Sequence, residues 1–274
     1  MTTRPARVSP QWLSLREPAD ACARAPELVR ELRECLPANG GVTVHDLGSG
    51  TGSMARWLAA QLDGPQRWIM YDLDDALLGL ATAHPPPEAA DGAPVKLEVR
   101  RRDITRLSPE ELSDADLVTA SAVLDMMTAD ELDRLLVTCA GAECPVLIAL
   151  SVTGQVDLTP ADPFDQYVAE AFNAHQRRTT GTRSLLGPDA VRAAEEGFTR
   201  LGLDVVVRPS PWRLGAEHAD LALEWLKGWL TAACEQRPEL RDPAESYTRR
   251  RLAEAAAGRL SVTLHHQDLL ARPR

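Results

Sequence analysis

Positive charge is scarce in this chain of 274 residues. The sequence has 30 lysines and arginines against 40 aspartates and glutamates, which gives a formal net charge of −10 and an isoelectric point near 5.1. Such a chain lacks the broad cationic field that holds a polyphosphate backbone. We therefore expect no nucleic-acid partner.

Long apolar runs are missing as well. None approaches the roughly 20 residues that are needed to cross a bilayer. The first residues, Met1 to Pro10, lack the apolar core of a secretory signal. These features predict a soluble, cytoplasmic protein that has no membrane partner.

Metal-binding patterns are also lacking. His265 and His266 are neighbours on an expected strand, where successive side chains point to opposite faces, so they do not form a ready chelate. The cysteines form no Cys-x-x-Cys pair, which favours reduced thiols over a disulfide framework or a zinc site. They are Cys22, Cys35, Cys139, Cys144 and Cys234. We expect no metal.

What the sequence does contain is an alternation of two patterns between residues 42 and 152. Short apolar runs that are typical of buried strands alternate with segments that carry apolar residues at helical spacing. The expected strands cover 42–47, 67–72, 95–103, 115–123 and 145–152, and the expected helices cover 52–62, 74–83 and 128–139. Strands that alternate with helices in this way predict a parallel sheet with helices on both faces.

Three glycines, Gly48, Gly50 and Gly52, follow the first expected strand in "VHDLGSGTGS". In an open parallel sheet, ligands bind at the carboxyl ends of the strands. The first two glycines let the turn pass close to a ligand, and the third lets a helix start beneath it. A tight turn without a ligand is the alternative interpretation.

The chemistry of the ligand follows from the neighbours of these glycines. A dinucleotide fingerprint needs a third glycine at position 53, where this chain has Ser53. Asp46 precedes the turn and would repel a pyrophosphate, whereas it suits a ligand that carries a cation. Asp72 ends the second expected strand, where a carboxylate can accept both ribose hydroxyls in either class of nucleoside fold.

The segment "HDLGSGTG" resembles the first motif, D/E-x-G-x-G-x-G, of class I S-adenosylmethionine-dependent methyltransferases. The resemblance covers about residues 40 to 151. It implies that the cofactor is S-adenosyl-L-methionine and that Asp46 and the turn hold its amino-acid part. The other cofactor contacts that it implies are the ribose at Asp72 and Leu73, the adenine at Asp103 and Ile104, and the crevice at Ser121. With Arg16 over the cofactor carboxylate, the predicted cofactor-binding set is Arg16, Asp46, Gly48, Ser49, Gly50, Gly52, Asp72, Leu73, Asp103, Ile104 and Ser121. A surface salt bridge is the alternative for Arg16.

The same resemblance implies an α/β fold of the doubly wound, Rossmann-like kind. We expect a seven-stranded, mostly parallel sheet with helices on both faces, whose last strand runs antiparallel. The helical stretch "DPFDQYVAEAFNAHQRRTTG" stands where the next sheet-covering helix is due, so it is interpreted as an inserted helical lid over 155–186. Residues 1–40 are expected to cover the cofactor site, and 41–154 with 187–274 to form the core.

The methyl acceptor is expected to be a small molecule of bacterial specialised metabolism, methylated on oxygen, nitrogen or carbon. No Asn-Pro-Pro-Tyr motif and no cysteine lies near the fourth strand, which argues against the chemistry used on DNA bases. His175 is the candidate general base, and Arg177 and Arg178 are candidates to hold an anionic acceptor. Asp125 and Trp212 are the other predicted substrate-binding residues.

Several alternatives stay open. A surface helix with a solvated basic end is the alternative interpretation of the helix that carries His175. An NAD(P)-dependent oxidoreductase is the second enzyme class, and a non-catalytic cofactor-binding sensor or accessory protein is the third reading. A homodimer is compatible with the sequence.

Overall fold

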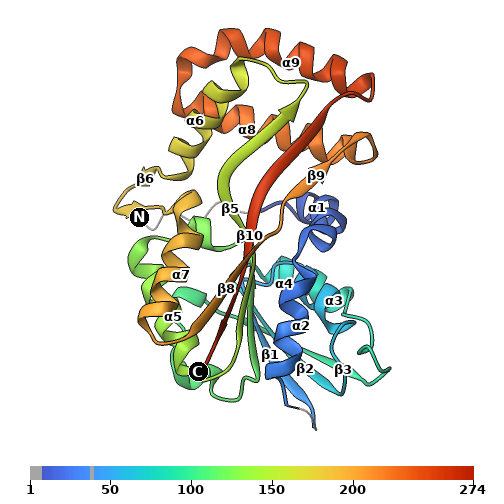
Figure 1. Ribbon diagram of the computed structural model, residues 1–274, viewed down its shortest axis with the longest axis vertical. Helices are drawn as coiled ribbons and strands as arrows, with labels where there is room; N and C mark the ends of the chain where they lie inside the picture. Colours follow the sequence, from blue (N-terminus) through green and yellow to red (C-terminus); the bar gives the residue numbers. More distant parts are fainter. Residues whose placement is uncertain (1–7, 38–39) are drawn as a thin grey trace.

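The main sheet follows from the predicted alternation. The computed structural model describes residues 8–37 and 40–274, and within them the main sheet has eight strands (Figure 1). Seven of these lie in the order β3-β2-β1-β4-β5-β10-β8. They are Val95–Arg101, Gln66–Asp72, Val42–Leu47, Leu117–Ser121, Val146–Thr159, Ser261–Arg272 and Asp204–Pro209.

The direction of the strands agrees with the prediction. β3, β2, β1, β4 and β5 are parallel. The last strand, β10, is antiparallel to both β5 and β8. The predicted doubly wound, mostly parallel fold is therefore confirmed.

The strand count differs from the expected seven because of β9, Trp212–Leu214. β8 continues to Pro209, and β9 pairs with Val262–Leu264 of β10. A run of three residues between Pro211 and Gly215 has no periodicity of its own. It becomes a strand because β10 extends beyond β8 and offers a free edge.

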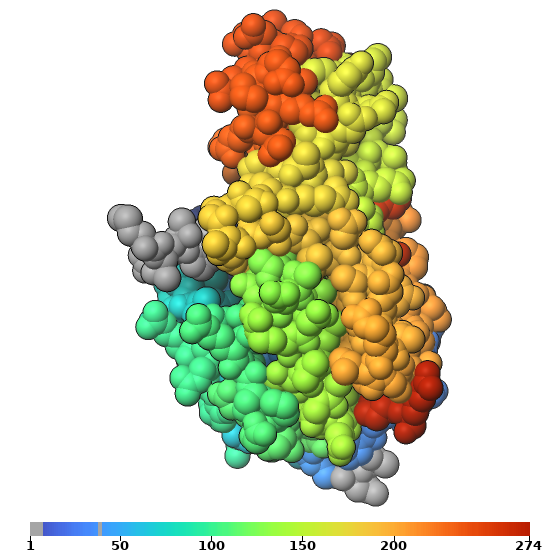
Figure 2. Space-filling view, turned by 90° about the vertical axis from the view of Figure 1, so that its left-hand side faces the viewer, coloured from blue at the N-terminus to red at the C-terminus, as the bar shows by residue number. Residues whose placement is uncertain are grey.

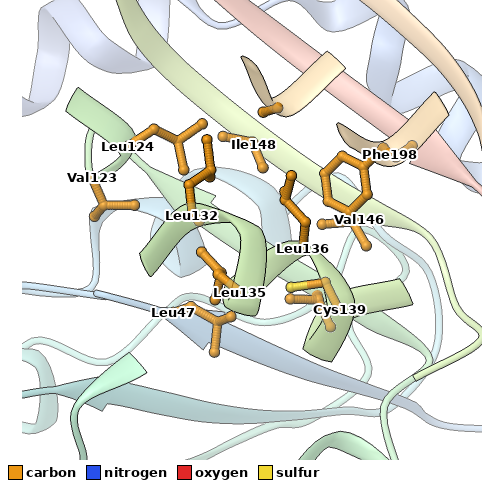
Figure 3. Close-up of a cluster of buried hydrophobic side chains, with 14 of the residues drawn as sticks. Leu47, Val123, Leu124, Leu132, Leu135, Leu136, Cys139, Val146, Ile148 and Phe198 are labelled. Atoms are coloured by element: carbon orange, nitrogen blue, oxygen red, sulfur yellow. The ribbon is translucent and has the colours of Figure 1, made fainter. Parts of the chain in front are cut away.

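Helices cover both faces of the sheet. On one face, α2 (Pro26–Cys35), α3 (Ser53–Ala59) and α4 (Asp75–Ala83) bury their apolar sides against the inner strands. On the other face lie α5 (Ala129–Gly141) and α7 (Ala190–Arg200). Figure 3 shows side chains of α5, such as Leu132 and Leu136, gathered against Val146 and Ile148 of β5 and Phe198 of α7. This two-sided burial is what makes the inner strands continuous apolar runs.

A third apolar cluster lies at the far ends of β5 and β10. There α6 (Phe164–Gln176), α8 (Ala219–Gln236) and α9 (Arg241–Ala256) pack together (Figure 1), and α1 (Pro10–Ala23) lies between this layer and the sheet. The remaining elements are short: 3₁₀ helices at Ile104–Arg106 (η1), Pro109–Leu112 (η2), Leu124–Met126 (η3), Gly187–Asp189 (η4), Ala216–His218 (η5) and Pro238–Leu240 (η6), and a hairpin of Thr179–Thr180 (β6) and Arg183–Ser184 (β7). Among the described helices, none is both long and apolar enough to cross a membrane.

The segment predicted to be an inserted lid joins this upper layer. β5 runs to Thr159, so the expected lid boundary at 155 falls inside a strand. The buried Arg251 of α9 donates to Asp165 of α6 and to the carbonyl of Pro160. Figure 2 shows the segment around α6 and the hairpin, in yellow, lying on the green segment that contains η3 and α5. Two residues of the expected N-terminal part, 38 and 39, and residues 1–7 lie outside the described residues.

Candidate functional site

The glycine turn connects β1 to α3 at the carboxyl edge of the sheet. Gly48 has a φ of +71°, and a Cβ at this position would lie 2.7 Å from Cγ1 of Val123. Gly50 has a φ of +55°, and the only atom within 4 Å of its Cβ position among those described is Cδ1 of Leu13, at 3.4 Å. The first glycine therefore packs against the segment after β4, whereas the second leaves a space that α1 covers. Ser49 is buried within the turn.

Asp72 stands beside this turn at the end of β2. Its Oδ2 accepts a hydrogen bond of 2.9 Å from the Gly50 N–H, and its Oδ1 accepts one of 2.9 Å from the Asp74 N–H. Leu73 follows with 47% of its surface exposed. The carboxylate is thus fixed beside the glycine turn, next to an exposed apolar side chain.

Asp46 is buried beneath the turn. Its Oδ1 accepts a hydrogen bond of 2.8 Å from the Thr119 hydroxyl, while its Oδ2 has no partner in the described part of the chain. Burial raises the pKa of this carboxyl to about 6. A buried carboxylate oxygen without a donor is costly, and a cation at the turn would satisfy it.

Arg24, at the end of α1, was not singled out by the sequence analysis. It is buried, and its guanidinium donates to the hydroxyls of Ser53 and Ser121 over 3.2 and 3.3 Å. Its Nε finds no acceptor among the described residues. No sequence pattern distinguishes Arg24 from the other arginines, because its position depends on how α1 folds back over the sheet.

Asp103 and Ile104 follow β3, and the side chain of Ile104 reaches the turn. Asp103 begins η1 and accepts hydrogen bonds from the backbone and hydroxyl of Thr105, at 3.1 and 2.7 Å. Cδ1 of Ile104 lies 3.5 Å from the Cβ position of Gly48. The structure therefore brings Asp46, Asp72, Ile104, Ser121 and the glycine turn to one edge of the sheet.

Arg16 is held in a stack on α1. It donates two hydrogen bonds to Asp20, at 2.9 and 3.1 Å. Its guanidinium lies 4.9 Å from the ring centre of Trp212 and 6.0 Å from that of Trp12. The indole N–H of Trp212 also donates to Asp20, over 2.9 Å. Arg16 thus forms a salt bridge, which was the alternative interpretation of this residue. Its guanidinium also lies against two aromatic rings.

Asp125 lies in η3, directly after Val123, which contacts the turn. It is half-buried, and burial raises the pKa of its carboxyl to about 6, while Arg16 acts to lower it. His266 of β10 is a further neighbour of this region, because its ring centre lies 5.4 Å from that of Trp212. Burial lowers the pKa of His266 to about 3, and Arg16 acts in the same direction.

The contacts of the predicted lid residues lead away from the turn. The His175 imidazole lies 3.2 Å from Glu235 of α8 and 3.2 Å from the Arg178 guanidinium. Arg177 pairs with Asp189 of η4. Arg183 pairs with Glu131 of α5 and donates to the carbonyl of Met126. These side chains therefore join α6 and the hairpin to α8, η4 and α5.

One part of the chain matches a known protein family. Residues 44–142 match the family model described as a methyltransferase domain, whereas no curated protein matches the chain. Among solved structures, the S-adenosylmethionine-dependent methyltransferase from Thiobacillus denitrificans in complex with S-adenosyl-L-homocysteine is 17% identical, with 98% of this chain and 100% of that chain covered and a TM-score of 0.46.

Two further solved structures are similar over most of the chain. The cyclopropane synthase MmaA2 from Mycobacterium tuberculosis is 15% identical, with 90% of this chain and 84% of that chain covered and a TM-score of 0.47. Phosphoethanolamine N-methyltransferase 2 from Haemonchus contortus is 18% identical and has a TM-score of 0.44. The match covers 90% of this chain but spans only 53% of that protein's length.

The family match contains Asp46, the glycine turn, Asp72 and Asp103. The match agrees with the predicted resemblance and with a methyltransferase as the enzyme class. It favours a methyltransferase over the oxidoreductase alternative.

Proposed function

We propose that this S-adenosylmethionine-dependent methyltransferase methylates a small-molecule acceptor that binds between the glycine turn, η3 and α1. The observation that carries the proposal is the cover over the turn. Leu13 of α1 lies over Gly50, at 3.4 Å from its Cβ position, and Glu17 of α1 pairs with Arg56 of α3. A covered site admits a small molecule more readily than a macromolecule.

The residues at the turn fit the cofactor. The unpartnered Oδ2 of Asp46 is suited to a cationic amino group, and the buried Arg24 guanidinium is suited to a carboxylate. Asp72 would accept from ribose hydroxyls, with Leu73 beside it. Asp103 and Ile104 would contact the adenine, and Ser121 would line the crevice. S-adenosylmethionine supplies a methyl group that its sulfonium has already activated.

The acceptor would lie near Asp125. A positioned nucleophile within roughly 3 Å of the methyl carbon, in a site that excludes water, supplies most of the rate enhancement. Asp125 would accept a proton from an acceptor hydroxyl or amine, because a pKa near 6 leaves the carboxylate ionised at neutral pH and still close to the operating pH. Arg16 and Trp212 would form the wall opposite Asp125.

We assign the base role to Asp125 in preference to His175. The imidazole of His175 is engaged by Glu235 and Arg178, and Arg177 is engaged by Asp189. An anionic acceptor would therefore need to displace existing ion pairs in order to use Arg177. The contacts of His175, Arg177 and Arg178 favour a structural role for these residues.

The proposal is tested in two steps. Calorimetry with S-adenosyl-L-methionine, S-adenosyl-L-homocysteine, NAD and NADP should show binding of the first two alone. The protein is then incubated with [methyl-¹⁴C]S-adenosyl-L-methionine and a cell extract that has been divided by ultrafiltration. Label in the small-metabolite fraction supports the proposal, whereas label in the macromolecular fraction alone contradicts it.

A further inference from the structure

A groove of about 1190 Å³ lies between α1, α6, α8 and α9. Its lining is mainly apolar and includes Trp12, Leu15, Phe172, Leu223, Leu226 and Leu252. Two of these side chains stay exposed in the folded protein, Leu15 at 37% and Leu252 at 48%. A hollow of this size exceeds the roughly 300 to 1,000 Å³ of most small-molecule pockets.

Gly228 lies on this groove in the middle of α8. A glycine inside a helix costs about 1 kcal/mol relative to alanine. Its backbone is not in the left-handed region, and no described atom lies within 4 Å of its Cβ position. Neither φ nor packing within the described chain requires a glycine here. Gly228 is exposed on α8, and its missing side chain leaves open space along the groove.

Trp229, the next residue, carries an unsatisfied donor. It lines the groove and is 1% exposed. Its ring stacks on that of Trp225, with centres 5.0 Å apart and planes at 23°. Its indole N–H has no acceptor in the described ranges, and a buried unpaired donor costs about 1 to 3 kcal/mol. An oxygen atom of a bound molecule would satisfy it.

Trp12 connects the groove to residues of the proposed acceptor site. This side chain lines the groove, and its ring centre lies 6.2 Å from that of Trp212. Arg16 lies over the ring of Trp212 and acts on the carboxyl of Asp125. A single ligand could therefore place one end near Asp125 and extend past Trp12 along α8.

We propose that this groove binds an elongated apolar group of the methyl acceptor, of the alkyl or acyl kind, with an oxygen atom near the Trp229 indole. The inference rests on the proposed function. The lining stretch from Asp220 to Thr231 rises about 16 Å at about 1.5 Å per residue, which suits a chain better than a compact ring. The charged residues Asp220, Glu224 and Lys227 also line the groove.

The test uses 11-(dansylamino)undecanoic acid as the probe. Energy transfer from the tryptophans of the groove to the dansyl group reports binding, and 1-decanol should displace the probe. In the Gly228→Leu variant, the added side chain occupies this open space along the groove, so the affinity should fall at least tenfold. The Gly228→Ala variant is the matched control and should stay within twofold of the wild type, because a methyl group fits the open space.

Each result decides between the occupants. Equal probe affinity in the Gly228→Leu variant and the wild type, or no binding to the wild type, overturns the inference. A dimer of the wild type that dissociates in the Gly228→Leu variant, measured by sedimentation, would assign the groove to a second copy and also overturns it.

Binding of S-adenosyl-L-homocysteine is measured on the same samples. Retained cofactor binding without probe binding contradicts only the groove. If the wild type does not bind S-adenosyl-L-homocysteine, the result contradicts the proposed function instead.

Discussion

The backbone N–H of Gly50 donates a hydrogen bond of 2.9 Å to Oδ2 of Asp72. This bond joins the turn after β1 to the end of β2. Oδ1 of the same carboxylate accepts from the Asp74 N–H. Because an ionised carboxylate has about four acceptor sites, two remain for the hydroxyls of a ribose. The carboxylate is therefore oriented before a ligand arrives.

Asp72→Ala should weaken S-adenosyl-L-homocysteine binding by about 1.5 to 3 kcal/mol, the usual contribution of hydrogen bonds to a charged acceptor. Isothermal titration calorimetry measures the change. Asp74→Ala is the matched control, since Asp74 caps α4 through the Ala76 N–H and its loss should lower stability by about 1 kcal/mol without changing the affinity. Equal affinities in the wild type and the Asp72→Ala variant would contradict the ribose assignment.

Gly50→Val should abolish S-adenosyl-L-homocysteine binding while the protein stays folded. A branched side chain at a φ of +55° is strained by roughly 1 to 3 kcal/mol, and it would occupy the space under Leu13. Gly50→Ala carries similar backbone strain with less volume, so it separates the two effects. Circular dichroism checks the fold. Retained binding in the valine variant would remove the glycine turn from the cofactor site.

Asp46→Asn should stabilise the ligand-free protein, and the gain should grow with pH. The carboxyl has a pKa of about 6 when folded and about 3.9 in an unfolded chain. Between pH 4 and 6 the unfolded chain therefore releases this proton while the folded protein retains it. The free energy of unfolding of the wild type then falls as pH rises.

The size of this effect is about 3 kcal/mol for a shift of about two pKa units. Urea denaturation at pH 4 and pH 7.5 measures it, and the variant should gain most of the difference at pH 7.5. Asp125 titrates in the same range. It is present in both proteins, so its contribution to the pH dependence cancels when the two are compared. The same variant should lose S-adenosyl-L-homocysteine binding. A stability gain that is independent of pH would show that Asp46 is ionised without penalty.

The sequence was sufficient to predict which residues meet at the glycine turn, because these residues lie in local segments. Asp46, Gly48 and Gly50 adjoin one strand and Asp72 ends the next, so their order along the chain places them together once the strands are parallel. The start of the expected helix 128–139 is also local, since the Thr128 hydroxyl caps α5 by accepting from the Glu131 N–H. These features depend on contacts within a few residues or on strand order.

The upper helical layer could not be predicted in this way. The partners of His175 and Arg177 are 60 and 12 residues away in the sequence, and β9 exists only because the distant β10 offers an edge. The helical spacing around His175 indicated a helix but not which neighbour its side chains would meet. Arg24 was missed because its hydrogen bond to Ser121 spans 97 residues.

Arg24→Lys should weaken S-adenosyl-L-homocysteine binding at least tenfold, because an ammonium group cannot reproduce the planar fork that suits a carboxylate. Binding of 5′-methylthioadenosine, which lacks the amino-acid part, should change less than twofold. Arg16→Lys is the comparison variant and should leave both affinities close to those of the wild type. The reverse pattern would transfer the carboxylate contact to Arg16, as the sequence analysis expected.

Asp125→Asn should lower the maximal rate of methyl transfer by roughly 100-fold for an acceptor that must lose a proton, because the amide cannot take it. The wild-type rate should rise as Asp125 ionises around pH 6 and then level off, and the variant should lack this inflection. The loss of rate in the Asp125→Asn variant should shrink at high pH, where the acceptor ionises without a base. Affinity for S-adenosyl-L-homocysteine should not change.

His175→Ala is the matched variant for this test. Burial and the neighbouring Arg178 lower the pKa of this imidazole, and its side chain joins α6 to Glu235 of α8. We expect a rate within twofold of the wild type and only a small loss of stability, since half-exposed ion pairs contribute about 0 to 1 kcal/mol. The measurement is the pH–rate profile with the acceptor that takes up the label from [methyl-¹⁴C]S-adenosyl-L-methionine. A 100-fold loss in the His175→Ala variant, with the Asp125→Asn variant near full activity, would reverse the two assignments and place the acceptor beneath α6 instead of beside η3.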